Sequence, residues 1–388
     1  MTKEVNVGMI GYGFMGKAHS FAYREQPMFF KTNAVPVMKA ICGRSEALVA
    51  DASKLYGWER YETDWKKLID SKDIDLIDIS TPNNTHKEIA IAAAKAGKDI
   101  ICEKPLAMNL ADAQEMLKAV ETSKVKHMIC FNYQKSPAIS LAKKLIEEDK
   151  VGKIYHFRVV YLQDWVMDPG VPCVWRLQKD VAGSGVLGDL LSHAIQMARF
   201  LVGELSEVNG MQETFVKKRP KPKPKTGLDV QMSAESSNEF EDIIVDDSTL
   251  FLARFKNGAL GSFESSRYAC GRKNGMRIEI NGSKGSILFE QEDMNILWFY
   301  SNEDCEGIRG FKRIQATEPE HPYMSAWWPV GHIIGYENTF VHLIYDFMKA
   351  IDENKMPYPN FMDGVECQRV IDAVERSVKG RMWVSIGK

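Results

Sequence analysis

Two segments far apart in the chain carry side chains that could act on an alcohol. The first is Cys102-Glu103-Lys104-Pro105, which directly follows an apolar run. Pro105 disfavours helical geometry at the preceding residue, so we expect Lys104 on an extended or turned backbone, with Glu103 beside it. An ammonium there could hold a hydroxyl oxygen and stabilise negative charge that develops on it. The simpler alternative is a solvated lysine in a turn.

The second segment is a helix predicted over Gly185–Leu201. Asp189, His193 and Gln196 are spaced four and three residues apart and would share one face of it. The rest of the helix is largely apolar, so this stripe would be costly unless it met a partner or a wet cleft. His193, with an ordinary pKa of about 6.5, is the natural general base, and Asp189 could tune it and bind a substrate hydroxyl. The alternatives are a satisfied Asp–His pair in the core and a zinc site; without a third ligand at metal spacing, we expect no metal.

A glycine-rich turn near the N-terminus predicts a dinucleotide site. The apolar run Val5–Ile10 leads into GYGFMG, a GxGxxG pattern that opens a helix and begins a βαβ series. The three glycines would allow a tight turn, close approach of a pyrophosphate, and close packing of helix on strand. The helix N-terminus would offer free N–H groups to the phosphates, the alternative being a turn without a ligand. The expected contacts are Gly11, Gly13, Phe14, Met15 and Gly16.

The end of the second predicted strand bears on the choice between NAD and NADP. It reads AICGRS, with no acid to bind a ribose 2′-hydroxyl until Glu46. Arg44 could pair with a 2′-phosphate, and Ser45 could donate to it, which favours NADP. The alternative is that Arg44 stacks on the adenine and that either cofactor binds.

A further cofactor contact is predicted where TPNNTH follows the apolar run Ile74–Ser80. The carboxyl edge of a parallel sheet is where ligands of such folds bind. His86 could instead be a surface residue at the start of a helix. The expected contacts are Thr81, Pro82, Asn83 and His86, joined by Glu103 and Lys104 from the next strand end.

The elements that would position these residues predict two domains. Residues 1–130 alternate strand and helix patterns, which implies an α/β Rossmann domain with a parallel sheet covered on both faces. Its strands are predicted at Val5–Ile10, Val37–Cys42, Ile74–Ser80, Asp99–Cys102 and His127–Phe131, and its helices at Met15–Glu25, Glu46–Tyr56, Thr85–Ala96 and Leu110–Thr122.

Residues 131–388 lack the regular alternation of strand and helix patterns seen in residues 1–130, and they predict an α+β domain. Close spacing of its strand-like runs favours antiparallel pairing. The strands are predicted at Lys153–Gln163, Ser248–Phe255, Ala259–Tyr268, Met276–Ile280 and Ser286–Phe289, and further helices at Ser136–Glu148, Glu337–Ile351 and Gly364–Val378. The segment VKKRPKPKPKTG, Val216 to Gly227, cannot form a helix or an internal strand, so we expect an exposed extended loop there, with nuclear targeting or polyanion binding as alternatives.

Composition excludes several classes of protein. Fifty basic and 52 acidic residues give a net charge of −2, so we expect no general attraction to nucleic acid or to an anionic membrane. No apolar run approaches the roughly 20 residues that span a bilayer, and MTKEVNVGMIGYGFMG enters a strand without a signal sequence. Seven dispersed cysteines indicate reduced thiols in a cytoplasmic protein.

The motifs GYGFMG, TPNNTH, EKP and GDLLSH occur in an order that resembles the glucose–fructose oxidoreductase/inositol dehydrogenase (Gfo/Idh/MocA) family over nearly the whole chain. YLQDW, HPYMSAWWPVG and GYE are most similar to its levoglucosan dehydrogenase-like members. The resemblance implies catalytic Lys104 and His193, with Asp189 assisting and contacting substrate. It also implies an open, mostly antiparallel sheet in the second domain that forms homo-oligomer contacts, giving a dimer or tetramer.

This chain departs from the family pattern at three positions. Gln196 stands where the family often has Asp, Gln134 where it often has Arg, and Cys42 where many NAD-dependent relatives have an acid. Aromatic faces suit the C–H surfaces of a sugar, and polar groups fix its hydroxyls. The expected pocket residues are Tyr133, Gln163, Asp164, Trp165, Trp175, Arg176 and Tyr336, in addition to Asp189 and His193, and Trp327-Trp328-Pro329 is expected to form a lid or an oligomer contact.

Together these features predict reversible hydride transfer between a secondary hydroxyl and NAD or NADP, with a sugar, anhydrosugar or inositol as substrate. His193 would remove the hydroxyl proton, Lys104 would anchor the oxygen, and Asp189 would hold a hydroxyl and orient the imidazole. Two alternatives remain open: a glycosidase of the same family that uses NAD transiently, and a non-catalytic dinucleotide sensor.

Overall fold

The computed structural model describes residues 2–223 and 235–387 of the chain. Its N-terminal part contains a six-stranded sheet in the order β3-β2-β1-β4-β5-β6, with every neighbouring pair parallel. The strands are β1 (Lys3–Ile10), β2 (Ala34–Cys42), β3 (Arg60–Glu62), β4 (Leu76–Ile79), β5 (Asp99–Cys102) and β6 (His127–Ile129). Sequence analysis missed β3, which has only three residues. The Rossmann topology is confirmed.

Helices cover both faces of this sheet because its strands are apolar on both sides. One face packs against α1 (Phe14–Phe29), α2 (Glu46–Tyr56) and α10 (Asn338–Asp352). The other packs against α3 (Trp65–Asp70), α4 (His86–Lys95) and α5 (Leu110–Ser123). Met9 and Ile10, adjacent in β1, belong to the two different cores, as the alternation of a strand requires.

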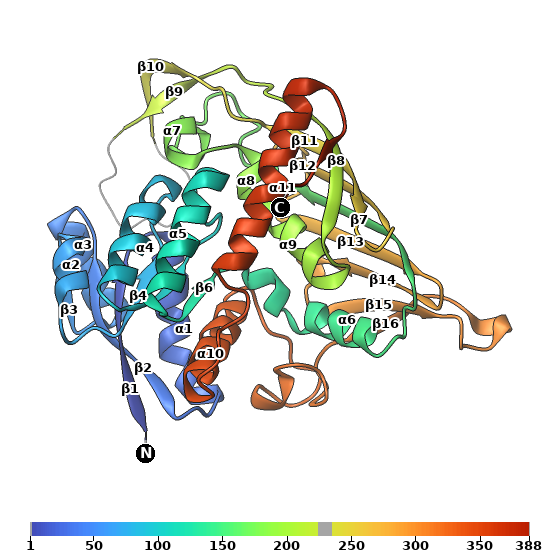
Figure 1. Ribbon diagram of the computed structural model, residues 1–388, viewed down its shortest axis with the longest axis horizontal. Helices are drawn as coiled ribbons and strands as arrows, with labels where there is room; N and C mark the ends of the chain where they lie inside the picture. The colour runs from blue at the N-terminus through green and yellow to red at the C-terminus, as the bar shows by residue number, and fades with distance from the viewer. Residues whose placement is uncertain (1, 224–234, 388) are drawn as a thin grey trace.

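The helix α10 comes from the end of the chain but packs on the nucleotide-binding sheet. Its buried residues Phe340, Leu343 and Phe347 share a core with Val7 and Met9 of β1. In Figure 1 it lies close to α1, although more than 300 residues separate the two helices in the sequence. The chain therefore returns to the nucleotide-binding sheet after residue 330.

The second part is built on a nine-stranded sheet in the order β16-β15-β14-β13-β7-β12-β11-β8-β17. Only the pair β7–β12 is parallel, so the predicted mostly antiparallel sheet is confirmed. The strands are β7 (Ile154–Leu162), β8 (Leu205–Glu213), β11 (Ser248–Phe255), β12 (Leu260–Ser266), β13 (Gly275–Gly282), β14 (Gly285–Glu290), β15 (Ile296–Ser301), β16 (Lys312–Gln315) and β17 (Val384–Ser385).

One face of the large sheet is packed by helices that lie between it and the nucleotide domain (Figure 1). These include α6 (Pro137–Glu147), α8 (Val186–Asp189), α9 (Leu191–Leu201) and α11 (Phe361–Gly380), with α7 (Lys179–Ala182) nearby. Phe251 and Ala253 of β11 point into this core, whereas Leu250 and Leu252, which alternate with them, are exposed. Within the described residues no helix is long and apolar enough to cross a membrane.

Two predictions about local structure are wrong. The single helix expected over Gly185–Leu201 is broken at Leu190 into α8 and α9. Part of the lysine–proline segment is no loop: β9 (Lys218–Pro222) pairs with β10 (Ser236–Asp242) in an antiparallel ribbon, with Arg219 fully buried. An isolated ribbon tolerates proline because only one edge of each strand needs partners. The end of that segment, residues 224–227, lies outside the described residues.

Candidate active site

The glycine turn after β1 has the shape that a bound pyrophosphate requires. Gly11 has a φ of +115°, and a Cβ there would lie 2.6 Å from the carbonyl oxygen of Ser80. A Cβ on Gly13 would meet no atom within 4 Å, so the space above it is open. Helix α1 begins at Phe14, and no side chain caps its N-terminus. Its first N–H groups are therefore available to an anion, and the turn fits a dinucleotide.

The other predicted cofactor residues divide into two groups. Arg44 is exposed, and Ser45, Thr81 and Pro82 are half-buried at the same carboxyl edge of the sheet. Asn83, in contrast, donates its side-chain amide to the carbonyl of Ala182, 2.8 Å away.

His86 is fully buried, so it is not the surface residue that was the alternative. Its ring nitrogens lie 2.9 Å from the carbonyl oxygen of Thr81 and 3.1 Å from that of Pro105. Burial lowers the pKa of His86. Since both nitrogens face protein carbonyls, the side chain ties the loop after β4 to the loop after β5 and offers no free group to a cofactor.

Lys104 lies two residues beyond β5 and reaches across to α8. Its Nζ donates to the backbone carbonyl of Asp189 at 2.7 Å and to Oδ1 of that residue at 3.1 Å. The other carboxylate oxygen accepts from Arg267 at 2.6 Å, with the Arg176 Nε 4.0 Å away. Burial alone would raise the pKa of Asp189, but the three positive charges outweigh it and hold that pKa well below its usual range.

The break in the predicted helix lies beside the contact that Lys104 makes. In a continuous helix the N–H of His193 would bond to the carbonyl of Asp189. Here that carbonyl accepts from Lys104, and the His193 N–H bonds to Leu190 at 3.1 Å. The break therefore gives Lys104 a backbone acceptor and places His193 at the start of α9.

His193 is packed by aromatic rings. Its ring centroid lies 4.4 Å from that of Tyr133 and 6.1 Å from that of Phe131. Burial, then the charge of Lys104, lower the pKa of His193 well below 6.5, while Asp189 acts in the opposite direction. The imidazole is therefore neutral at pH 7 and can accept a proton.

The expected contact between Asp189 and His193 is not observed. Among the described residues, the carboxylate of Asp189 bonds to Lys104 and Arg267, and no side chain bonds to the ring nitrogens of His193. The other member of the predicted polar stripe, Gln196, bonds to neither Asp189 nor His193. Its partners are Gln134, Arg199 and Tyr358. The physical reason is that other charged and polar groups hold these side chains: Asp189 bonds to two cations, and Gln196 bonds to Arg199.

A chain of hydrogen bonds runs along the sheet beside His193. The Tyr133 and Tyr161 hydroxyls are 3.0 Å apart, and Tyr161 donates to Asn274 at 2.7 Å. Asn274 also accepts from Gln163 at 3.1 Å, and Gln163 in turn accepts from Trp165 at 3.0 Å. Three predicted pocket residues, Tyr133, Gln163 and Trp165, are thus linked through two residues that were not predicted, Tyr161 and Asn274. Their polar groups can fix hydroxyls, and their rings can cover C–H surfaces.

Tyr336 joins this wall to the cofactor turn. Its ring stacks on Phe14, with centroids 6.1 Å apart, and lies edge-on to Tyr133 at 6.1 Å. Trp175 stacks on the guanidinium of Arg176, 4.4 Å away, next to Asp189. Tyr336 therefore links the wall that contains Tyr133 to the cofactor turn, while Trp175 and Arg176 lie beside Asp189.

Three other predicted residues have different surroundings. Asp164 is held by Lys273 and the N–H of Gly271 at 2.8 and 3.0 Å, in an exposed ion pair. Trp327 packs on Phe29 of α1 and donates to His342 at 2.7 Å, so it belongs to the core over α10. Trp328 remains half exposed.

Sequence analysis missed a buried ionic chain beneath Lys104. His19 of α1 lies 2.9 Å from Asp78 of β4 and 3.0 Å from Glu103. Glu103 in turn accepts from the backbone N–H of Lys104 at 3.1 Å. Burial would lower the pKa of His19, but Asp78 outweighs it and raises the pKa well above 6.5. The lone acid within the apolar strand LIDI was the available signal, since a buried carboxylate needs a partner.

Arg267 was also missed, although an arginine directly after β12 could have signalled a residue aimed at a sheet edge. The same buried chain forms the one potential metal cluster among the described residues, in which ligand atoms of His19, Glu103 and Cys130 lie within 4.8 Å of one another. A histidine that is protonated between two carboxylates has no lone pair for a metal.

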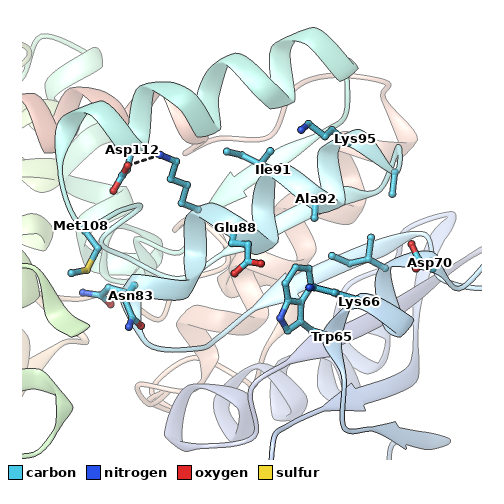
Figure 2. A pocket seen from close by; sticks show the side chains of 14 residues that line it. Trp65, Lys66, Asp70, Asn83, Glu88, Ile91, Ala92, Lys95, Met108 and Asp112 are labelled. Atoms are coloured by element: carbon cyan, nitrogen blue, oxygen red, sulfur yellow. Dashed lines mark hydrogen bonds and ion pairs between the residues drawn. The ribbon is translucent and has the colours of Figure 1, made fainter. Parts of the chain in front are cut away.

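A pocket of about 820 Å³ lies away from these residues, on the outer surface of the nucleotide domain. Figure 2 shows its wall, formed by α3, α4 and the segment around Met108, with Lys87 paired to Asp112 at 2.7 Å. Lys104, Asp189 and His193 do not line it. It is therefore separate from the proposed reaction centre.

The fold and the site define a nicotinamide-dependent oxidoreductase. Two family models match the chain: the oxidoreductase family with an NAD-binding Rossmann fold over residues 5–131, and the GFO/IDH/MocA C-terminal domain over residues 139–288. The chain belongs to the GFO/IDH/MocA family, as its motifs predicted.

Individual relatives cover the full length. Levoglucosan dehydrogenase of Pseudarthrobacter phenanthrenivorans is 44% identical over 99% of this chain and 98% of its own, and inositol 2-dehydrogenase of Rhizobium meliloti is 26% identical over 98% and 99%. An oxidoreductase domain protein from Kribbella flavida matches with a TM-score of 0.94 and 47% identity, covering 100% of both chains. Levoglucosan dehydrogenase with NADH and levoglucosan matches at 0.93 and 43%, again over 100% of both. The expected preference for NADP finds no support among these relatives.

Proposed function

We propose that this protein oxidises a secondary hydroxyl of a sugar, with an anhydrosugar such as levoglucosan as the first candidate, and transfers the hydride to NAD. The observation that carries the proposal is that Lys104, from the nucleotide domain, bonds to Asp189 and lies close enough to His193, from the substrate domain, for its charge to lower the pKa of that imidazole. The 44% identity to levoglucosan dehydrogenase over 99% of the chain supports the substrate class.

The roles of the side chains follow from their surroundings. A neutral His193 takes the hydroxyl proton, and Lys104 holds the oxygen while charge develops on it. Asp189, fixed by Lys104 and Arg267, has carboxylate oxygens that can accept from a neighbouring sugar hydroxyl. When bound on the glycine turn, the nicotinamide supplies the acceptor for the hydride. The aromatic packing around His193 keeps bulk water from the reacting carbon.

The sugar would lie against the wall formed by Tyr133, Trp165 and Tyr336. Aromatic rings cover its C–H face, while Gln163 and Arg176 are placed to bind hydroxyls. Together with the rings of Tyr161 and Phe131 around His193, this wall suits a compact, rigid ring better than an extended chain.

We further propose NAD, not NADP, as the cofactor. Burial, followed by the charges of Glu62 and Asp64, raises the pKa of Cys42 at the end of β2 to about 12. These two acids come from β3 and the residues after it, and they supply the negative charge that β2 lacks. A 2′-phosphate would be repelled there despite Arg44. Replacing Glu62 with Gln should narrow the preference for NAD over NADP in kcat/KM.

Two further properties belong to the proposal. The exposed face of the large sheet carries Met211, Leu250, Leu252 and Leu260, which suits contact with a second copy in a dimer or tetramer. All seven cysteines are free, which is typical of a cytoplasmic protein.

The test is a substrate panel of levoglucosan, myo-inositol, scyllo-inositol and glucose with each cofactor, monitored by the absorbance of reduced nicotinamide. We expect accumulation of NADH with levoglucosan. Hydrolysed glycoside without net NADH would instead indicate a glycosidase. Cofactor-dependent assembly without any turnover, unaffected by replacing Lys104 and His193, would indicate a sensor.

A further inference from the structure

Arg219 is the one fully buried residue among the positive charges of the ribbon β9–β10. Its neighbours Lys218, Lys221 and Lys223 have side chains 71%, 47% and 54% exposed, whereas the side chain of Arg219 is inaccessible. A guanidinium is removed from water in this way only where several acceptors compensate for the loss of hydration.

Three of the acceptors of Arg219 are carbonyl oxygens of one loop. Arg219 donates to the carbonyl oxygens of Val166 at 2.6 Å, Asp168 at 2.9 Å and Val171 at 3.1 Å. It also bonds to the hydroxyl of Tyr268. We call residues 164–177 the substrate loop. A planar guanidinium, with its five donors, can serve three carbonyls that point toward one centre, which an ammonium does less well.

Other contacts from the ribbon hold the same loop. The N–H of Cys173 donates to the carbonyl of Pro220 at 2.7 Å, and Ser236 donates to Gly170 at 2.8 Å. A small separate core lies beneath, in which Val166, Cys173 and Leu177 of the loop pack with Ile243 and Val245, just beyond β10. In Figure 1 the ribbon lies apart from both large sheets, above α7, so its described contacts with this loop are its main attachment to the fold.

A buried carboxylate, Asp247, lies at the base of the strand that carries Arg219. Burial raises the pKa of Asp247, and the charges of Arg219 and Arg267 oppose that rise. The backbone N–H groups of Phe215 and Val216, which precede the ribbon, also bond to the Asp247 carboxylate. The strand that carries Arg219 is therefore fixed at its base.

Both ends of the substrate loop contribute to the reaction centre. Near its start, the ring of Trp165 lies 5.6 Å from the guanidinium of Arg267, which holds Asp189. Near its end, Arg176 lies 4.0 Å from the same carboxylate, and its carbonyl accepts from Arg267 at 3.4 Å. The position of the loop thus determines where Trp165 and Arg176 meet a sugar.

We propose that Arg219 is a positioning residue for substrate binding: by joining three carbonyls of residues 164–177, it fixes the loop that presents Trp165 and Arg176 to the sugar. The inference rests on the proposed function, because it assigns this loop to the sugar side of the site. The ribbon β9–β10 then belongs to the substrate-binding apparatus, although it is remote from the cofactor turn.

The experiment compares Arg219→Met, which keeps the length but removes the donors, with Arg219→Lys and with the exposed neighbour Lys218→Met as control. KM for levoglucosan, kcat, NADH affinity and amide hydrogen exchange are measured in the full-length protein. For Arg219→Met we expect KM to rise at least about 10-fold, with kcat within about 3-fold. NADH affinity should not change, and exchange should accelerate in residues 164–177 alone. Arg219→Lys should be intermediate, and Lys218→Met unchanged.

The outcomes separate this role from a general structural one. An unchanged KM and unchanged exchange in Arg219→Met would overturn the proposal, as would faster exchange across the whole chain with parallel loss of NADH binding. If Arg219→Met did not fold, Arg219→Lys would decide by the same two measurements. Absence of sugar oxidation by the wild-type protein would defeat the proposed function, whereas the exchange measurement would still test the hold of Arg219 on the loop.

Discussion

Lys104 and His193 have opposite surroundings. The ammonium of Lys104 is bound by two oxygens of Asp189, whose carboxylate is held from the other side by Arg267. The imidazole of His193 is packed by rings, and no described side chain bonds to its nitrogens. The first arrangement fixes a charge in place, and the second leaves a proton acceptor free. In the proposed mechanism the first arrangement would hold the substrate oxygen, and the second would accept the proton.

The free imidazole should give the largest effect when it is removed. In His193→Ala we expect kcat to fall about 10³-fold, because no neighbouring group can replace the base. NADH affinity, measured by fluorescence titration, should not change, since the cofactor turn is untouched. His156→Ala, on the exposed face of β7, is the control. Wild-type turnover in His193→Ala would remove the basis for the comparison.

Removing the fixed charge should lower the rate and also move its pH dependence. In Lys104→Met we expect kcat to fall about 10²-fold. In the wild type, alcohol oxidation should decline only below pH 6.5, because burial and Lys104 lower the pKa of His193. Without the ammonium that pKa rises, so the acidic limb of kcat/KM should shift to higher pH.

The control for this variant is Lys87→Met, which removes a surface lysine paired with Asp112. Its pH profile should match that of the wild type. If the acidic limb of the kcat/KM profile lay at the same pH in Lys104→Met and in the wild type, the charge of Lys104 would not influence His193.

Replacing Arg267 tests whether Asp189 needs a second cation besides Lys104. In Arg267→Met one carboxylate oxygen of Asp189 loses its 2.6 Å partner. We expect kcat/KM to fall about 10-fold and the free energy of unfolding to fall by about 1–3 kcal/mol, measured by denaturant titration. Arg254→Met, in an exposed ion pair on β11, is the matched control. Unchanged kcat/KM would show that Lys104 alone fixes Asp189.

The smallest effect on kcat is expected from a change among the aromatic residues around His193. Tyr161→Phe removes a hydroxyl that bonds to Tyr133 and Asn274 but not to His193. We expect a loss of about 1 kcal/mol in the free energy of unfolding, with kcat within about 2-fold of the wild type. Tyr155→Phe, exposed on the same strand, should change neither. A 10-fold loss of kcat in Tyr161→Phe would show that the hydroxyl chain does take part in proton transfer.

The sequence alone predicted the site best at the ends of the strands. Apolar runs followed by glycines or by EKP located the cofactor turn and Lys104, because strand periodicity and turn chemistry are local properties. The helix through Asp189 and His193 had an equally clear pattern, yet it breaks. At the break the carbonyl of Asp189 bonds to Lys104, 85 residues earlier in the chain, and no local pattern contains that contact.

Buried polar partners were missed for the same reason. Arg219 looked like one more solvated charge among lysines and prolines, and only tertiary contacts distinguish it. His19 and Asp78 lie 59 residues apart and meet across α1 and β4. Short strands such as β3 have too few residues for a periodic pattern, so the acids that it brings to the cofactor edge could not be predicted.

The return of α10 to the first domain constrains how this protein can be divided or recombined. A fragment that ends near residue 130 would expose the apolar surface that Phe340, Leu343 and Phe347 normally cover, and such a surface promotes aggregation. A chimera that exchanges nucleotide-binding modules between relatives must therefore transfer residues 338–352 together with the N-terminal strands.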